Sequence, residues 1–290
     1  MKTAVKEKQK NLSTQEKTVS LGQVSLYVKN LAVMKRFYTE VLQLEVIEES
    51  KDHIVLGHGS SPLVSLYTSS DASHALATEA GLYHLAIVFS SRRALARVLV
   101  HILTHWQHYF SGSADHLVSE AFYFTDPEGN GVELYFDKQR TVWQWENGNI
   151  KMASLYIDPA SYIKEHHDTK GEVHDSTMGH VHLKVGDIPE AKKFYADVLG
   201  FEITAELPNA LFVSRDKYHH HIGMNTWESA GAKKRENEKG LKSFDIIVHS
   251  EKEFTEIKKR LILHAIAFNE KNNCIILHDP WHTQINIYFV

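Results

Sequence analysis

The strongest constraint on this chain is a repeat within its own sequence. The segment GQVSLYVKNLAVMKRFYTEVLQLEV, which begins at Gly22, aligns without a gap with GHVHLKVGDIPEAKKFYADVLGFEI, which begins at Gly179. Both copies open with alternating apolar and polar residues, as strands do, and continue with apolar residues at helical spacing. The second helical pattern ends at Gly200, and glycine is a common helix terminator. The chain therefore repeats a strand–helix–strand unit.

Two weaker copies of this unit begin at Gly81 and Gly240, where GLYHLAIVF and GLKSFDIIV precede helical patterns. Each finishes in a hairpin-like segment, FYFTDPEGNGVELYFD or IILHDPWHTQINIYFV, in which an Asp-Pro pair marks a turn between alternating strands. We therefore predict an α+β fold of four βαβββ modules, near residues 20–70, 81–138, 179–227 and 240–290.

A single βαβββ sheet has an apolar concave face that it cannot cover alone, so modules are expected to close on each other in pairs. The prediction is two barrel-like paired-module units. Along the chain, we expect a disordered arm over residues 1–17 and a first pair of modules over residues 18–138. A linker over residues 139–178 then leads to a second pair of modules over residues 179–290.

Composition narrows the class of protein. The chain has 290 residues with 32 basic and 36 acidic side chains, so its charge does not favour nucleic acid or a membrane surface as a partner. The lone cysteine, Cys274, excludes an internal disulfide and fits a reducing compartment. No apolar run approaches the roughly 20 residues of a membrane helix. We expect a cytoplasmic protein, and its oligomeric state stays open between a monomer and a homo-oligomer.

Three motifs mark the modules: H-[VL]-x-[LI] at an opening strand, F-Y-x-x-V-L-G in the helix, and D-P-x-G-N-x-x-E-L at the close. Together they resemble the vicinal-oxygen-chelate superfamily, which includes glyoxalases, bleomycin-resistance proteins and extradiol dioxygenases. The resemblance covers nearly the whole chain and is strongest to the bacterial catechol-2,3-dioxygenase branch. It implies the glyoxalase/extradiol dioxygenase fold.

In that superfamily, metal ligands come from the first and last strands of facing modules. The four opening positions hold Gln23, His84, His180 and Ser243, and the closing positions of modules two and four hold Glu133 and Asn286. A lone strand histidine is more often structural than a ligand, but two here share one register position. Two histidines and one carboxylate are the ligand set of non-haem Fe(II) oxygenases.

The distribution of these residues also bears on how the modules pair. If modules paired in chain order, His84 and Glu133 would lie in one unit and His180 in the other. If module two pairs with three and module one with four, all three residues fall in one unit. We therefore expect residues 81–138 and 179–227 to form the metal site, with the outer modules structural.

The resemblance also implies residues that act beside the metal. His220, in the segment Tyr218–Asn225, matches the acid/base histidine of extradiol dioxygenases, although strand alternation would set His219 and His221 on the face opposite to it. Tyr123 matches their substrate-binding tyrosine, and His116 a substrate-contacting polar group. Their usual histidine beside that position is replaced here by Ala114.

These assignments predict an Fe(II)-dependent extradiol dioxygenase that cleaves a catechol-like aromatic diol with O2 to a muconic semialdehyde. One alternative is a glyoxalase or thiol transferase on the same fold, holding Mn²⁺, Ni²⁺ or Zn²⁺ with one of His219, His220 and His221 as a fourth ligand, for which His221 is the candidate. A non-catalytic small-molecule binding protein is a second alternative, which the three ligands disfavour.

Overall fold

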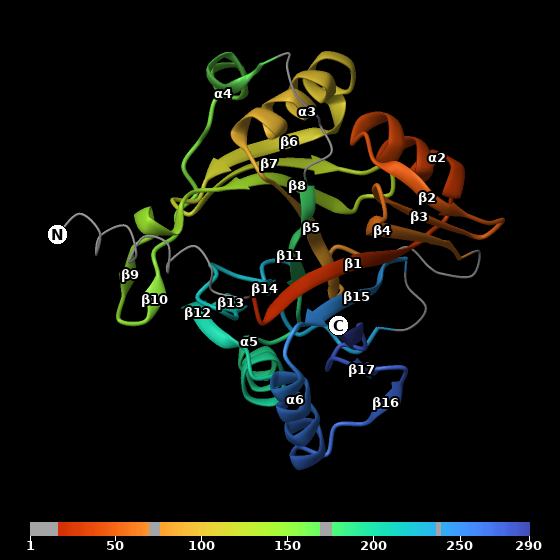
Figure 1. Ribbon diagram of the computed structural model, residues 1–290, viewed down its shortest axis with the longest axis vertical. Helices are drawn as coiled ribbons and strands as arrows, with labels where there is room; N and C mark the ends of the chain where they lie inside the picture. Colours follow the sequence, from red (N-terminus) through yellow and green to blue (C-terminus); the bar gives the residue numbers. More distant parts are fainter. Residues whose placement is uncertain (1–16, 70–75, 169–175, 236–238) are drawn as a thin grey trace, which may run out of the picture.

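The computed structural model describes residues 17–69, 76–168, 176–235 and 239–290. All of the expected N-terminal arm except Lys17 lies outside the described residues. The described residues form two eight-stranded sheets with helices packed on their outer sides (Figure 1). This confirms the α+β fold of two paired-module units.

The first sheet, which we call the outer sheet, is built from modules one and four. Its strands, in spatial order, are β16 (Phe268–Lys271), β17 (Cys274–His278), β18 (Gln284–Phe289), β15 (Gly240–Val248), β1 (Val19–Val28), β4 (Ser61–Thr68), β3 (His53–His58) and β2 (Glu45–Glu49).

The second sheet, the inner sheet, is built from modules two and three. Its strands, in spatial order, are β12 (Glu202–Leu207), β13 (Ala210–Ser214), β14 (Ile222–Asn225), β11 (Ser176–Lys184), β5 (Gly81–Phe89), β8 (Gly131–Asp137), β7 (Ser119–Thr125) and β6 (Phe110–Asp115).

Each sheet is completed by one antiparallel seam between the opening strands of two modules: β1 pairs with β15, and β5 pairs with β11. Within every module, the opening strand is parallel to the closing strand. The seams therefore join a module from the first half of the chain to one from the second half. This is the pairing that places His84, Glu133 and His180 in one sheet.

The helices follow the sequence repeat. The α-helices are α2 (Leu31–Arg36), α3 (Arg92–His105), α4 (Pro159–His166), α5 (Ile188–Lys192) and α6 (Glu251–Leu263), and the shorter turns are π-helical at Phe37–Val41 and Lys193–Val198 and 3₁₀ at Gln107–Tyr109 and Arg140–Val142. Asn30 and Asp187, which align in the repeat, both cap a helix by accepting a backbone N–H, at the starts of α2 and α5.

The helices pair differently from the sheets. α3 contacts the first module, where His101 Nε2 lies 2.7 Å from the carbonyl oxygen of Glu40. α6 contacts the third module, where Arg260 donates to the carbonyl of Val198 at 3.1 Å. Figure 1 shows α2 beside α3 at one end of the molecule and α5 beside α6 at the other. Helices thus pair within each half of the chain, whereas sheets pair across the halves.

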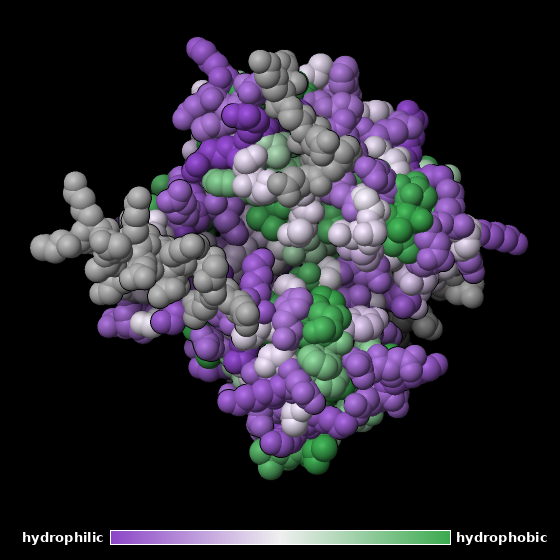
Figure 2. Space-filling model, viewed as in Figure 1, coloured by the Kyte–Doolittle hydropathy of each residue, from purple (hydrophilic) through white to green (hydrophobic). Residues whose placement is uncertain are grey.

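The described part of the predicted linker contains β9 (Trp145–Glu146), β10 (Asn149–Ile150) and α4. It is held to the inner sheet by a two-way backbone bridge between Leu155 and Asp115. Figure 2 shows that most of the visible face is hydrophilic, with apolar side chains in a few separate groups. Among the described residues, no helix is long and apolar enough to cross a lipid bilayer.

Candidate metal centre

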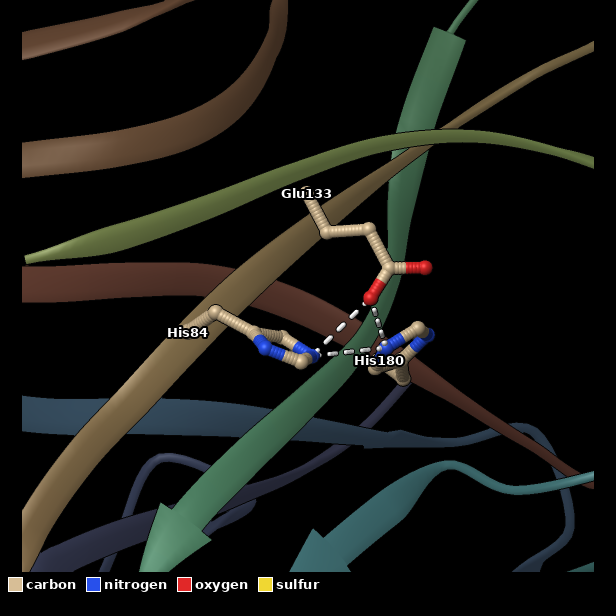
Figure 3. A group of neighbouring side chains, drawn as sticks. All are labelled: His84, Glu133 and His180. Atoms are coloured by element: carbon tan, nitrogen blue, oxygen red, sulfur yellow. Dashed lines mark hydrogen bonds and ion pairs between the residues drawn. The ribbon is translucent and has the colours of Figure 1, made fainter. Parts of the chain in front are cut away.

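Three side chains from three strands of the inner sheet point at one another (Figure 3). His84 Nε2 lies 3.0 Å from Glu133 Oε2 and 3.2 Å from His180 Nε2, and the remaining distance, from His180 Nε2 to Glu133 Oε2, is also 3.2 Å. All three side chains are buried. Within the described ranges, this is the one group of three or more histidine, cysteine, aspartate or glutamate side chains that has the spacing of metal ligands.

The sheet register explains why these residues meet. Tyr123, Glu133, Ala86 and His180 form a row across β7, β8, β5 and β11, each paired with the next. His84 lies two residues before Ala86 on β5, so its side chain leaves the same face of the sheet. Because alanine is small, the space between Glu133 and His180 stays open to the imidazole of His84.

The outer sheet lacks this space at the equivalent place. Its register pairs Asp245 with Asn286, as the inner sheet pairs Ala86 with Glu133. The Asp245 carboxylate is buried and accepts a hydrogen bond from Asn286 Nδ2 at 2.8 Å. The outer sheet therefore has the hydrogen-bonded carboxylate of Asp245 at the position where the inner sheet has Ala86, beside the candidate metal centre.

The protonation states suit metal binding. Burial alone would raise the pKa of Glu133, but the neighbouring His180 and His84 outweigh it and hold that pKa well below its ordinary value. Burial lowers the pKa of His180 to about 4, against the opposing effect of Glu133. The centre thus holds an ionised carboxylate and a neutral His180 imidazole at neutral pH, and these are the forms that bind metal ions.

The spacing of the three donor atoms fits one face of an octahedron. Ligands at right angles and about 2.1–2.2 Å from an ion lie about 3.0–3.1 Å apart, whereas tetrahedral ligands lie about 3.4–3.6 Å apart. The observed separations are 3.0–3.2 Å. The residues therefore fit a six-coordinate ion with three further positions on its open side.

The ring of His180 is oriented by packing. Its Nδ1 is buried and makes no hydrogen bond to any described part of the chain. Instead the imidazole lies between His220 and Tyr135, with ring centres 4.2 and 4.9 Å away. Gly179 allows this arrangement, because a Cβ there would overlap the hydroxyl of Tyr135.

The centre opens into a cavity of about 1070 Å³. Besides the three candidate ligands, the histidine and aromatic side chains that line it are Tyr83, His116, Tyr123, Phe124, His182, Phe212, His220 and Trp227. One wall comes from the linker, through Ile150, Met152, Ala153 and Ser154. The cavity is much larger than its metal end, so it has room for an organic ligand beside a bound ion.

Tyr123 and His116 form a hydrogen-bonded pair in this cavity. His116 Nδ1 lies 2.7 Å from the carbonyl oxygen of Ala153, so Nδ1 carries the proton and donates it there. His116 Nε2 is then the acceptor for the Tyr123 hydroxyl, at 2.5 Å. Burial, followed by the charge of Glu133, raises the pKa of Tyr123 well above its ordinary value, so the phenol stays protonated.

The three consecutive histidines differ from the strand alternation expected of them. Residues 215–221 form an irregular connection between β13 and β14, with left-handed backbone at Asp216 and Lys217, so the alternation is wrong here. His219 and His220 lie together, with their Nδ1 atoms 2.8 Å apart. His221 lies apart from the three candidate ligands: its Nδ1 accepts from the backbone N–H of Arg215 at 3.2 Å.

Sequence reasoning missed His182. Its ring centre lies 4.9 Å from that of His84, and it lines the cavity while its Nε2 lies 3.0 Å from Asn225 Nδ2. The signal was present, since His180 and His182 are two residues apart on a strand and so share a face.

Comparisons with known proteins find relatives of this chain. A profile of the glyoxalase/bleomycin resistance protein/dioxygenase superfamily matches residues 20–134 and 177–272. A curated relative, the catechol-2,3-dioxygenase of Bacillus subtilis (strain 168), is 32% identical over 268 residues, which are 90% of this chain and 93% of the relative.

Solved structures share the fold at low sequence identity. One, from Bacillus subtilis subsp. subtilis str. 168 and described provisionally as a dioxygenase, has a TM-score of 0.61 at 12% identity, covering 94% of this chain and 86% of its own. Glyoxalase I from Zea mays has a TM-score of 0.54 at 13% identity, covering 93% and 92%. These two likenesses describe the fold alone, because the same fold carries both names.

Proposed function

The chain belongs to the glyoxalase/bleomycin resistance protein/dioxygenase superfamily, as its motifs predicted, and on that premise we propose that it is an Fe(II)-dependent extradiol dioxygenase. Its substrates would be a catechol-like aromatic diol and O2, and its product a muconic semialdehyde. The observation that carries the proposal is the buried group of His84, Glu133 and His180, whose spacing leaves three coordination positions open.

Those residues would hold the iron. Bound Fe(II) would supply the activation of O2 and the binding of both diol oxygens, which need three adjacent positions. The name of the 32% identical relative, a catechol-2,3-dioxygenase, supports a catechol as the substrate class and O2 as the co-substrate. Such a reaction belongs to the breakdown of aromatic compounds.

The cavity residues would bind the diol and move its protons. Tyr123 is held beside Glu133 by its bond to His116, so its oxygen is positioned to contact a substrate hydroxyl. His220 lines the cavity against the ring of His180, and burial lowers its pKa well below the ordinary value, so it is a neutral imidazole that can accept a proton.

The geometry gives less support to a four-ligand glyoxalase. With His221 as the fourth ligand, that function would need this residue beside the three candidate ligands, but its Nδ1 lies 2.9 Å from Ser214 Oγ and also accepts from the backbone of Arg215. His221 packs against Tyr218, with ring centres 4.9 Å apart, and does not line the cavity.

One assay separates the candidate functions. Metal-free protein is loaded anaerobically with Fe²⁺, Mn²⁺, Ni²⁺ or Zn²⁺ in parallel and mixed with catechol, 3-methylcatechol or 4-methylcatechol before air is admitted. We expect the Fe²⁺ form to consume one O2 per diol and to give the yellow colour of a muconic semialdehyde, and a His84→Ala variant to do neither. Isomerisation of a thiol–methylglyoxal adduct by the Ni²⁺ or Zn²⁺ form, with no O2 uptake from any diol, would overturn the proposal.

A further inference from the structure

A chain of hydrogen bonds leads from the cavity to Asp137, the last residue of β8 in the inner sheet. His220 Nδ1 lies 2.8 Å from His219 Nδ1, and His219 Nε2 lies 2.8 Å from Asp137 Oδ1. The other oxygen of Asp137, Oδ2, accepts the hydroxyl of Tyr218 at 2.8 Å, and that hydroxyl is 2.7 Å from the hydroxyl of Tyr135. The carboxylate of Asp137 thus accepts hydrogen bonds from His219 on one side and from Tyr218 on the other, and donates none.

The carboxylate determines which nitrogen of each histidine carries a proton. Since Asp137 can only accept, His219 must carry its proton on Nε2. A neutral His219 then has a lone pair on Nδ1, so the proton between the two rings belongs to His220 Nδ1.

With Nδ1 engaged, His220 has Nε2 as its free heteroatom, and His220 is the member of the pair that lines the cavity. We propose that Asp137 and His219 are positioning residues that fix His220 as its Nδ1–H tautomer, so that its Nε2 lone pair faces the substrate as the proton acceptor. This inference rests on the proposed function, for which it names how the base is prepared.

His219 is built to hold this position. Its side chain is fully buried, and its ring is held between those of Tyr218 and Trp143, with centres 4.1 and 5.4 Å away. The indole Nε1 of Trp143 donates in turn to the carbonyl oxygens of Val118 and Lys138, at 3.2 and 3.1 Å. The orientation of His219 is therefore fixed by its contacts with these two rings as well as by Asp137.

Two substitutions at His219 test separately its hydrogen bond to His220 and its hydrogen bond to Asp137. In His219→Asn, the side-chain amide oxygen can occupy the place of Nδ1 and still accept from His220, while the contact with Asp137 is lost. In His219→Gln, the longer amide can reach Asp137 but leaves His220 without its acceptor. Both variants remove the imidazole and leave a polar amide of moderate size, so each is the other's control for folding.

The tautomer can be read directly by long-range ¹H–¹⁵N correlation spectra of the full chain, labelled with ring-¹⁵N histidine and loaded with diamagnetic Zn²⁺. The His220 signals are those lost in His220→Phe. We expect the His220 proton on Nδ1 in the wild type and in His219→Asn, and a mixture of tautomers in His219→Gln. A wild-type His220 that carries its proton on Nε2 would overturn the inference.

The same variants, loaded with Fe²⁺, give a kinetic test. We expect His219→Gln to lower kcat about 10–100-fold at unchanged iron content and nearly unchanged KM, and His219→Asn to stay closer to the wild type. Equal kcat in His219→Gln and wild type would contradict the inference. A wild type that takes up no O2 would instead refute the proposed function, and the Zn²⁺ spectra would still report the tautomer.

Discussion

The hydroxyl of Tyr38 donates a buried hydrogen bond to the carboxylate of Asp126, with 3.2 Å between Oη and Oδ2. Tyr38 lies in the helical segment of module one and Asp126 in the closing turn of module two. The repeat reproduces the bond in the second half of the chain, where Tyr195 donates to Asp279 at 3.0 Å. Since modules one and two belong to different sheets, these bonds tie the outer sheet to the inner sheet.

Removing one of these hydroxyls should weaken the whole fold. We expect Tyr38→Phe to lower the free energy of unfolding by about 1–2 kcal/mol, because the buried carboxylate of Asp126 loses a donor. Urea unfolding followed by circular dichroism measures the change. Tyr156→Phe is the control, since Tyr156 is 77% exposed and should change stability by less than about 0.5 kcal/mol. Equal effects from the two variants would contradict a structural role for the Tyr38–Asp126 bond.

The stability of the metal-free protein should fall on acidification below pH 6.5. Burial lowers the pKa of His180 to about 4 and that of His221 to about 3, so the folded state resists protons that unfolded histidines accept from about pH 6.5 downward. Asp126 acts in the opposite sense. Burial raises its pKa to about 6, so its contribution is fully present below its unfolded value near 3.8 and is lost as pH rises through 6.

Two variants test these signs in urea titrations between pH 7.5 and 4. His221→Asn, which keeps an acceptor for the backbone of Arg215, should make the acid loss of stability shallower. Asp126→Asn should make it steeper, because it removes the carboxylate that gains stability as pH falls. Either variant changing the slope in the other direction would show that the assigned pKa shift is wrong.

The metal should depend on the three candidate ligands and on no residue at their equivalent positions in the outer sheet. We expect His84→Ala, Glu133→Ala or His180→Ala to abolish bound metal and turnover together, since each removes one of three ligands. Ser243→Ala and Asn286→Ala, at the positions that correspond to His84 and Glu133, should keep about one metal ion per chain. Metal content by mass spectrometry decides, and full occupancy in His84→Ala would refute the centre.

His220 should affect turnover without affecting the metal. We expect His220→Phe to keep its iron and to lower kcat by roughly 10²–10⁴, the usual contribution of a positioned acid or base. His221→Asn should keep both iron and turnover, because His221 lies outside the cavity. The opposite result, with iron lost from the His221 variant, would favour the four-ligand glyoxalase.

Much of the fold could be predicted because the repeat makes the sequence its own template. Aligning Gly22 with Gly179 sets Asn30 opposite Asp187, and in the structure each of these two residues caps a helix at that point of its module. The π-helical turns after α2 and α5 could not be predicted, since a single extra residue in a helical turn leaves the apolar spacing almost unchanged.

In the site, sequence reasoning depended on regular strands. Tyr123 and Glu133 lie side by side because a hairpin fixes their register, so their spacing in sequence predicts their contact. His219 and His220 lie in an irregular connection whose left-handed residues, Asp216 and Lys217, carry no glycine signal. Strand alternation does not apply to such a connection, so the contact between the rings of His219 and His220 could not be predicted from the sequence.

The seams between β1 and β15 and between β5 and β11 have a consequence for the order in which the molecule can be made. Modules leave the ribosome as one, two, three and four, but the inner sheet cannot close before module three has appeared. The edge of β1 must wait for module four. In a nascent chain that ends in the linker, β1 and β5 would therefore each have one unpaired edge, and such edges recruit other chains. The chain can therefore reach its native state only after its second half has been synthesised. Until then, the open strand edges of the first half must be protected from pairing with other chains.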